Sequence, residues 1–288
     1  MDVKLEQLIK KRKRINQINH WLFFAGTSVG IITLAILIYS ILSKGLGWFD
    51  WQFLTSFPSR FAEKAGIKSA LWGSIWLIAL TAPISFILGV GTAIYLEEYA
   101  KKNWFSKLIQ ININNLAGVP SIVFGILGLT LFVRGIGFGR SLIAGALTMS
   151  LLILPIIVVS AQEAIRAIPE TIRNASYALG STRWQTIRNI VLPAAFPSIL
   201  TGTILALSRA IGETAPLIMI GALTFVAFTP KSIFDSFTVL PIQIFNWTSR
   251  PQEEFQYVAA AGIMVLLIVL LTMNSIAIYL RNKFQRRF

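Results

Sequence analysis

Long stretches without a charged residue are the feature of this 288-residue sequence that most restricts its fold. An α-helix needs about 20 apolar residues to cross the roughly 30 Å hydrocarbon core of a bilayer. Five uncharged stretches of 22 to 28 residues meet this requirement, namely 21–43, 69–96, 108–133, 141–162 and 255–280. A sixth, 194–226, qualifies if the bilayer tolerates its two charges, Arg209 and Glu213. We therefore predict an all-α polytopic membrane protein with six transmembrane helices.

The positive charges indicate how these helices are oriented. The chain has 26 Lys and Arg and 12 Asp and Glu, a formal net charge of +14. Of the cations, 17 fall in 1–20, 97–107, 163–193 and 281–288, 8 fall in 44–68, 134–140 and 227–254, and Arg209 remains. Because cytoplasmic loops are enriched in Lys and Arg, both termini are predicted to be cytoplasmic. The run KKRKR at 10–14 is interpreted as a contact with membrane lipid and not with nucleic acid.

The domain organisation follows from the spans. We predict a basic cytoplasmic tail, 1–20, and a single transmembrane domain, 21–288, with a cytoplasmic loop at 163–193 and an outer loop at 227–254. The sequence has no cysteine and one histidine, which excludes thiol chemistry and a histidine–cysteine metal site. An enzyme embedded in the membrane would need a nucleophile, a base or metal ligands within the spans. No such set is present, so we expect no enzymatic activity.

The loop 163–193 has the pattern of two short helices. Pro169 suits a first helical turn, and Gly180 suits a left-handed residue that ends the helix. Thr182 and Gln185 fit a capping box that starts a second helix. One face of the first helix is predicted to hold Ile172, Ala175, Ser176 and Leu179. The pair is either an ordinary connector or a docking surface for a cytoplasmic partner.

The same loop resembles the EAA loop of ABC importer permeases, whose pattern is E-A-A-x3-G-x9-I-x-L-P. Gly180 is followed by nine residues and then by Ile190, Val191, Leu192 and Pro193. Pro193 is expected to disrupt the helix before the next span. The family's glutamate falls on Asn174 and its second alanine on Ser176, so a salt bridge from that glutamate is not expected.

The resemblance implies a type I, MetI-like permease bundle and a role for 169–190. In the family this loop fits a groove on the nucleotide-binding subunit. The residues to which the resemblance assigns this coupling are Asn174, Ala175, Ser176, Leu179, Gly180, Trp184, Ile190, Leu192 and Pro193. No G-x-x-x-x-G-K-[ST] motif is present in the chain, so we expect no cofactor here and expect ATP and Mg to bind a partner ATPase.

Arg209 and Glu213 lie within a predicted span. Arg209 is 16 residues beyond Pro193, which is about 24 Å along a helix and near the middle of the bilayer. Each charge there costs at least about 2.5 kcal/mol on insertion scales. The i, i+4 spacing places both on one helical face, but Arg before Glu is the less favourable order for helix stability. Either they form a structural ion pair between helices or they line a translocation path.

The chemistry of the two groups indicates a substrate class. A guanidinium is a planar fork of donors that matches tetrahedral oxyanions. Phosphate at neutral pH keeps a proton that it can donate to a carboxylate, whereas sulfate has none. A carboxylate beside the arginine should therefore admit phosphate and repel sulfate, provided that both side chains reach one substrate position.

A longer resemblance agrees with this interpretation. From RNASYALGSTRWQTIRNIVLPAAFPSILTGTILALSRAIGETAPL through DSFTVLPIQIFNWTSRPQEEF, the chain resembles permease subunits of phosphate-specific ABC importers. The family implies a multi-pass location in the bacterial inner membrane and a substrate-path role for Arg209 and Glu213. It implies as partners a PstC-like permease, two PstB-like ATPase subunits and an external PstS-like phosphate-binding protein. A sulfate or molybdate permease and a stand-alone secondary anion transporter are the alternatives.

Overall fold

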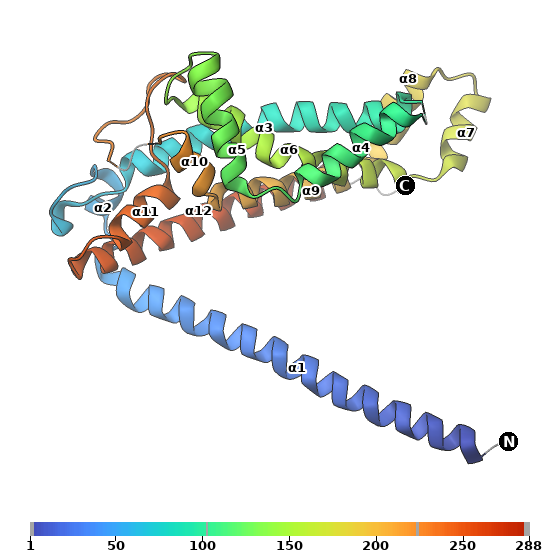
Figure 1. Ribbon diagram of the computed structural model, residues 1–288, viewed down its shortest axis with the longest axis horizontal. Coiled ribbons are helices and arrows are strands. Elements are labelled where there is room, and N and C mark those ends of the chain that lie inside the picture. Colours follow the sequence, from blue (N-terminus) through green and yellow to red (C-terminus); the bar gives the residue numbers. More distant parts are fainter. Residues whose placement is uncertain (1–2, 102, 223–224, 285–288) are drawn as a thin grey trace.

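The computed structural model describes residues 3–101, 103–222 and 225–284, and every regular element within them is helical (Figure 1). Two of the cations counted in the C-terminal segment, Arg286 and Arg287, and Lys102 lie outside the described residues. Five described helices are long and apolar enough to cross a membrane. They are α1 Val3–Gly45, α3 Lys68–Ile94, α6 Leu142–Arg166, α9 Leu192–Gly212 and α12 Glu254–Phe284. A bent pair of helices supplies the sixth span when it is counted as one.

The sixth span is broken, although the sequence predicted a continuous helix over 108–133. Helix α4, Trp104–Leu116, and helix α5, Ser121–Gly128, are separated by a bend of 107°. The segment continues into a π-helical part, η4, Leu129–Gly135. The break contains Gly118 and Pro120, and a proline has no N–H and disfavours helical backbone at the residue before it. Length and hydropathy alone did not reveal this break.

The predicted span 194–226 is also shorter than expected. Helix α9 ends at Gly212, and a short helix, α10 Ala215–Met219, follows it. Pro216 explains this end, because a proline ring collides with the carbonyl four residues earlier, which here belongs to Gly212. The chain then turns at Gly221, whose φ is +86°. Residues 223–224 of the predicted span lie outside the described residues.

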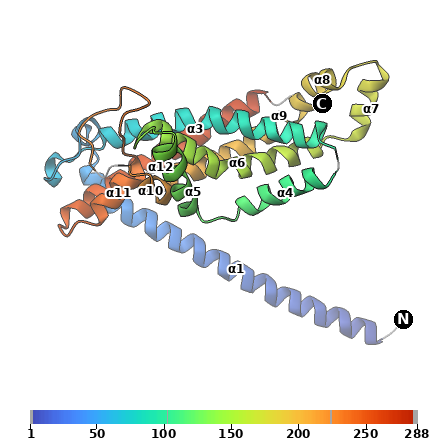
Figure 2. The same cartoon turned by 45° about the horizontal axis from the view of Figure 1, so that its top comes forward.

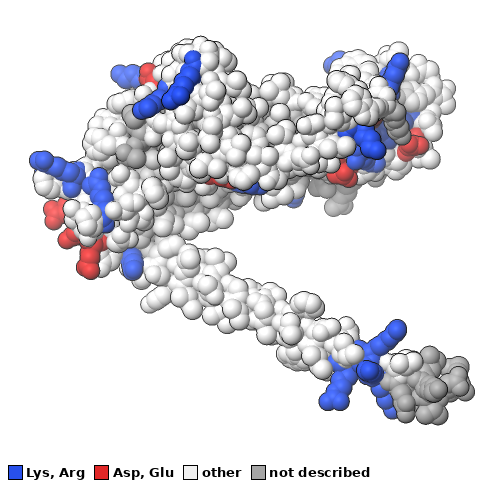
Figure 3. Space-filling model, in the orientation of Figure 1, with Lys and Arg blue, Asp and Glu red and all other residues white. Residues whose placement is uncertain are grey.

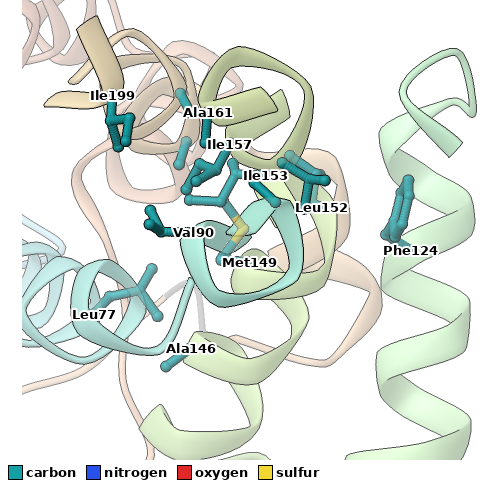
Figure 4. Close-up of a cluster of buried hydrophobic side chains, with 14 of the residues drawn as sticks. Leu77, Val90, Phe124, Ala146, Met149, Leu152, Ile153, Ile157, Ala161 and Ile199 are labelled. Atoms are coloured by element: carbon teal, nitrogen blue, oxygen red, sulfur yellow. The ribbon is translucent and has the colours of Figure 1, made fainter. Parts of the chain in front are cut away.

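The centre of the bundle is α6, which packs between α3 and α9. Figure 4 shows the apolar cluster that these helices share. Its labelled members include Leu77 and Val90 of α3, five α6 residues from Met149 to Ala161, and Ile199 of α9. The glycine at position 89 allows α3 to approach α6 closely. A Cβ atom at this position would lie only 2.6 Å from the side chain of Ile157.

Helix α1 leaves the bundle instead of packing along it (Figures 1 and 2). It contacts α12 only near its C-terminal end, where Gly45 approaches Ala260, Ala261 and Met264. No residue in its apolar window is buried. Residues of the predicted tail 1–20 from Val3 onward belong to the same continuous helix as the first span.

Different helices lie at the two ends of the molecule. The N-terminus, the C-terminus, α7 Glu170–Ala178 and α8 Arg183–Thr186 lie toward one end, called the inner end (Figure 1). The opposite, outer end holds α2 Trp51–Thr55, α11 Leu240–Thr248 and the short 3-10 helices η1 Leu46–Trp48 and η2 Ala62–Lys64. Charged side chains gather at these ends and at the start of α1, with a mostly uncharged surface between them (Figure 3). This distribution fits a protein that crosses a membrane.

The outer segment 227–254 is a packed part of the fold. Helix α11 buries Leu240, Gln243 and Trp247 completely. The segment also caps the start of α6, because the backbone N–H of Leu142 donates to the Asp235 carbonyl over 3.1 Å. The carboxylate of Asp235 accepts hydrogen bonds from the N–H groups of Lys231 and Ser232, which lowers its pKa.

We expect Gly73→Ala to destabilise the outer end, because a Cβ atom there would lie 2.0 Å from the carbonyl oxygen of Thr238. Because this oxygen belongs to the backbone, it can make room for the new methyl group only if the surrounding segment of the chain shifts. Overpacking of this kind costs about 1–3 kcal/mol. The thermal midpoint of the purified chain in detergent should fall. Gly91→Ala, in the same helix but with nothing within 4 Å of the new Cβ, is the control, and equal midpoints for the two variants would contradict the prediction.

Candidate translocation and coupling sites

Arg209 and Glu213 form an ion pair at the point where α9 ends. The Nε atom of Arg209 donates to Oε1 of Glu213 over 3.3 Å. Glu213 is not in the helix, since its ψ of 126° is extended, although its N–H still donates to the Ala210 carbonyl over 3.2 Å. The predicted placement of both residues in one helix is therefore wrong, and Pro216 is the physical cause. Among the described residues, this pair joins neighbours in the chain and not two helices.

The two members of the pair differ in exposure. The side chain of Arg209 is 55% exposed and that of Glu213 is 18% exposed. Leu205, one turn before Arg209 on the same face, is also exposed. Behind this face, the Ser208 hydroxyl hydrogen-bonds to Asn274 of α12. An exposed guanidinium within a membrane span needs water or another subunit around it, because lipid would reject it.

The helix pair of the loop 163–193 is formed as the sequence predicted. Gly180 has a φ of +80°, which places it in the left-handed region and ends α7. Thr182 and Gln185 form the predicted capping box at the start of α8. Because both signals depend only on neighbouring residues, the sequence located them correctly.

The coupling residues do not all face the same way. Asn174, Ala175, Leu179 and Trp184 are exposed on the helix pair. Ser176 is buried, and its hydroxyl is 2.8 Å from the hydroxyl of Thr186 in α8. The predicted common face of Ser176 and Leu179 is therefore wrong, because Ser176 faces α8 and joins the two helices.

The helix from α8 into α9 is continuous, so the predicted disruption at Pro193 is wrong. It runs from Arg183 to Gly212 through a π-helical segment, η5 Ile187–Val191. This wider turn ends two residues before Pro193, whose missing N–H would disturb a regular helix. Ile190, Leu192 and Pro193 are partly buried within this continuous helix.

Sequence reasoning missed a polar network at the inner end. Glu97 and Glu98 lie in the π-helical turn η3, Tyr95–Tyr99, that follows α3. Glu97 pairs with Arg166 over 2.6 Å, and Glu98 pairs with Arg173 over 3.1 Å. Two adjacent glutamates directly after an uncharged span were the available signal. Their partners, 69 and 75 residues away in the chain, were not predictable from spacing.

An all-α bundle of membrane-spanning helices with a helix pair projecting at its inner end defines a multi-pass membrane protein. The chain belongs to the family of binding-protein-dependent transport system inner membrane components, whose model matches residues 85–284. It is therefore a multi-pass protein of the inner membrane. The predicted fold class is confirmed.

Relatives with known names match nearly the full chain. The probable ABC transporter permease protein YqgI of Bacillus subtilis is 34% identical over 264 residues, which are 88% of this chain and 90% of the relative. The phosphate transport system permease protein PstA 1 of Mycobacterium tuberculosis is 32% identical over 295 residues, which are 99% of this chain and 94% of the relative.

Solved structures agree on the fold. A bacterial ABC transporter that imports the acidic polysaccharide alginate matches with a TM-score of 0.67 at 17% identity, over 97% of this chain and 100% of the other. The MetNI methionine ABC transporter, in inward-facing conformations, matches with a TM-score of 0.63 at 16% identity, over 75% of this chain and 95% of the other. At these identities the similarity establishes the fold alone.

Proposed function

We propose that this chain is the membrane-spanning permease subunit of an ATP-driven phosphate importer. The observation that carries the proposal is the Arg209–Glu213 pair at the C-terminal end of the span that contains α9, with the guanidinium more than half exposed. The relatives named as phosphate transport permeases support the same substrate.

The chemistry of the pair favours phosphate. Nε of Arg209 is engaged by Glu213 at 3.3 Å, which leaves the donors of the two terminal nitrogens for an anion. Glu213 lies beside that position as an acceptor for the phosphate hydroxyl. Sulfate would meet the same carboxylate without a proton to offer and would be repelled. The arginine must also release its anion, so the counter-charge next to it suits a site of transient binding.

Two uncovered surfaces support partner subunits. The exposed face of α1 and the exposed Arg209 both suit a second permease, of PstC type, that completes the path. The exposed tip of α7 and α8 suits two ATPase subunits of PstB type, one on each permease, and these would bind ATP and Mg. An external binding protein of PstS type would deliver the anion at the outer end. Closure of the ATPase dimer would then turn the path from inward-open to outward-open.

The test is uptake by the assembled complex in proteoliposomes with binding protein outside and ATP inside. We expect labelled phosphate to accumulate only when ATP is present. A roughly tenfold excess of unlabelled sulfate, enough to occupy most of a site that bound both anions equally, should leave this accumulation unchanged. Inhibition by sulfate, or by molybdate added in the same excess, would assign the path to another oxyanion. Uptake that persists without ATP and without ATPase subunits would indicate a secondary transporter instead.

A further inference from the structure

The polar network at the inner end contains one buried ion pair that joins three elements. Oε1 of Glu98 accepts from Nε of Arg173 over 3.2 Å and from its Nη2 over 3.1 Å. The side chain of Glu98 is 6% exposed and that of Arg173 is 15% exposed. Glu98 belongs to the turn that follows α3, and Arg173 belongs to α7.

The same guanidinium also caps α6. Nη1 of Arg173 donates to the carbonyl of Ile168 over 2.6 Å, and Nη2 donates to the carbonyl of Ile165 over 2.8 Å. Ile165 lies in the last turn of α6, where its carbonyl also accepts the backbone N–H of Ile168 over 3.3 Å, and Ile168 lies in the short connection between α6 and α7. A single planar fork therefore holds the ends of α3 and α6 to the first helix of the projecting pair.

Local helix stability does not explain these glutamates. Glu97 and Glu98 follow the C-terminal end of α3, where the helix dipole disfavours negative charge. Both are nevertheless engaged, Glu97 by Arg166 and Gln162 of α6 and Glu98 by Arg173. The ion pairs with Arg166 and Arg173 therefore explain why two glutamates are placed at this helix end.

Other contacts also join the α7–α8 pair to the rest of the bundle. Ser176 of α7 is hydrogen-bonded to Thr186 of α8, and α8 is continuous with α9, which carries Arg209. The guanidinium of Arg183 also lies over the Tyr99 ring, 5.2 Å from its centre. A displacement of the pair therefore reaches α6 and α9 through the backbone, and it reaches the end of α3 through the Arg173–Glu98 pair and the contact of Arg183 with Tyr99.

We infer that Glu98 and Arg173 are a positioning pair for energy coupling, through which movement of the α7–α8 pair is transmitted to α3. This inference rests on the proposed function of an ATP-driven importer. Without the pair, the ATPase would still move α7 and α8, together with the ends of α6 and α9 that continue from them, but the end of α3 would no longer follow. ATP would then be hydrolysed with little anion transport.

The experiment measures phosphate uptake and ATP hydrolysis in the same proteoliposomes, each per assembled complex. For Glu98→Gln we expect the ratio of phosphate moved to ATP hydrolysed to fall about tenfold, the scale of a coupling contact, while ATP hydrolysis persists. Glu163→Gln is the matched control, because Glu163 is 66% exposed and pairs only with Arg166 among the described residues. A ratio for Glu98→Gln equal to that of the control would overturn the inference. Loss of folding alone lowers the amount of complex and leaves the ratio unchanged.

Two further variants keep the test decisive. Arg173→Lys keeps the positive charge but not the fork, so the same fall in ratio is expected. Since the chain has no cysteine, Glu98→Cys combined with Arg173→Cys places the only two thiols at this contact. Complete cross-linking with a short bifunctional thiol reagent should restore the ratio, and a ratio that stays low would contradict the inference. If none of the variants assembles, the pair serves folding and the inference fails.

Failure of the coupling inference can be distinguished from failure of the proposed substrate. A wild-type complex that moves sulfate instead of phosphate would contradict the proposed function, yet the coupling ratio would still be measured with sulfate.

Discussion

Arg209→Gln is expected to lower ATP-dependent phosphate uptake by about 100-fold while the complex still assembles. The variant keeps a polar side chain of similar length but removes the positive charge, and hydrogen bonds to a charged group contribute up to about 3 kcal/mol, which corresponds to roughly 100-fold. Assembly should survive, because the Arg209 side chain is 55% exposed in this subunit and supports no other described element by an ion pair. Uptake of labelled phosphate by proteoliposomes checks the loss.

Arg60→Gln is the matched control for this substitution. Arg60 is an exposed arginine of the outer end, and its guanidinium lies over the Phe61 ring. Its loss removes the same charge from the chain without touching the proposed path. Normal uptake by the Arg209→Gln complex would remove Arg209 from the substrate path, whatever the control shows.

Leu179→Asp is expected to weaken association with the ATPase subunit by about 100-fold. Leu179 is the most exposed large apolar residue among those described, at 88%, and it ends α7 directly before the left-handed Gly180. An apolar anchor seated in a groove contributes roughly 2 kcal/mol or more, and burying a new carboxylate adds to the loss. Co-purification of the ATPase with the tagged permease measures the effect.

The control for Leu179→Asp is Phe228→Asp, which introduces the same charge at an exposed apolar residue of the outer segment. ATPase co-purification should be unchanged in this control. Retention of the ATPase by Leu179→Asp at the wild-type level would show that the tip of the helix pair is not the docking surface.

Local features of the fold were predictable from the sequence. The span predicted at 141–162 is α6, Leu142–Arg166, and that predicted at 255–280 is α12, Glu254–Phe284. The turn at Gly180 and the capping box at Thr182 were also located, because each depends on residues within four positions. Hydropathy and capping signals can both be recognised within a short segment of the sequence.

Features that depend on distant residues or on local breaks were not predictable in the same way. The bend between α4 and α5 lies inside an uncharged run, so a rule based on charge and length passes over Pro120. The ion pair of Glu98 and Arg173 joins residues 75 positions apart, and spacing carries no information about such a contact. The position of Glu213 outside α9 required the effect of Pro216 to be weighed against the apolar run around it.

Because the segment Ile187–Val191 is π-helical, residues on its two sides cannot be aligned by uniform counting. A π-helical turn holds one residue more than an α-helical turn, which corresponds to a rotation of about 100° on a helical wheel. A wheel drawn straight from Trp184 to Arg209 therefore assigns the wrong side to one of them. We expect this segment to accommodate a one-residue deletion, because removal of Asn189 would leave a uniform α-helix and keep both flanking faces. The same deletion a turn later would swing the projecting pair around the axis of α9.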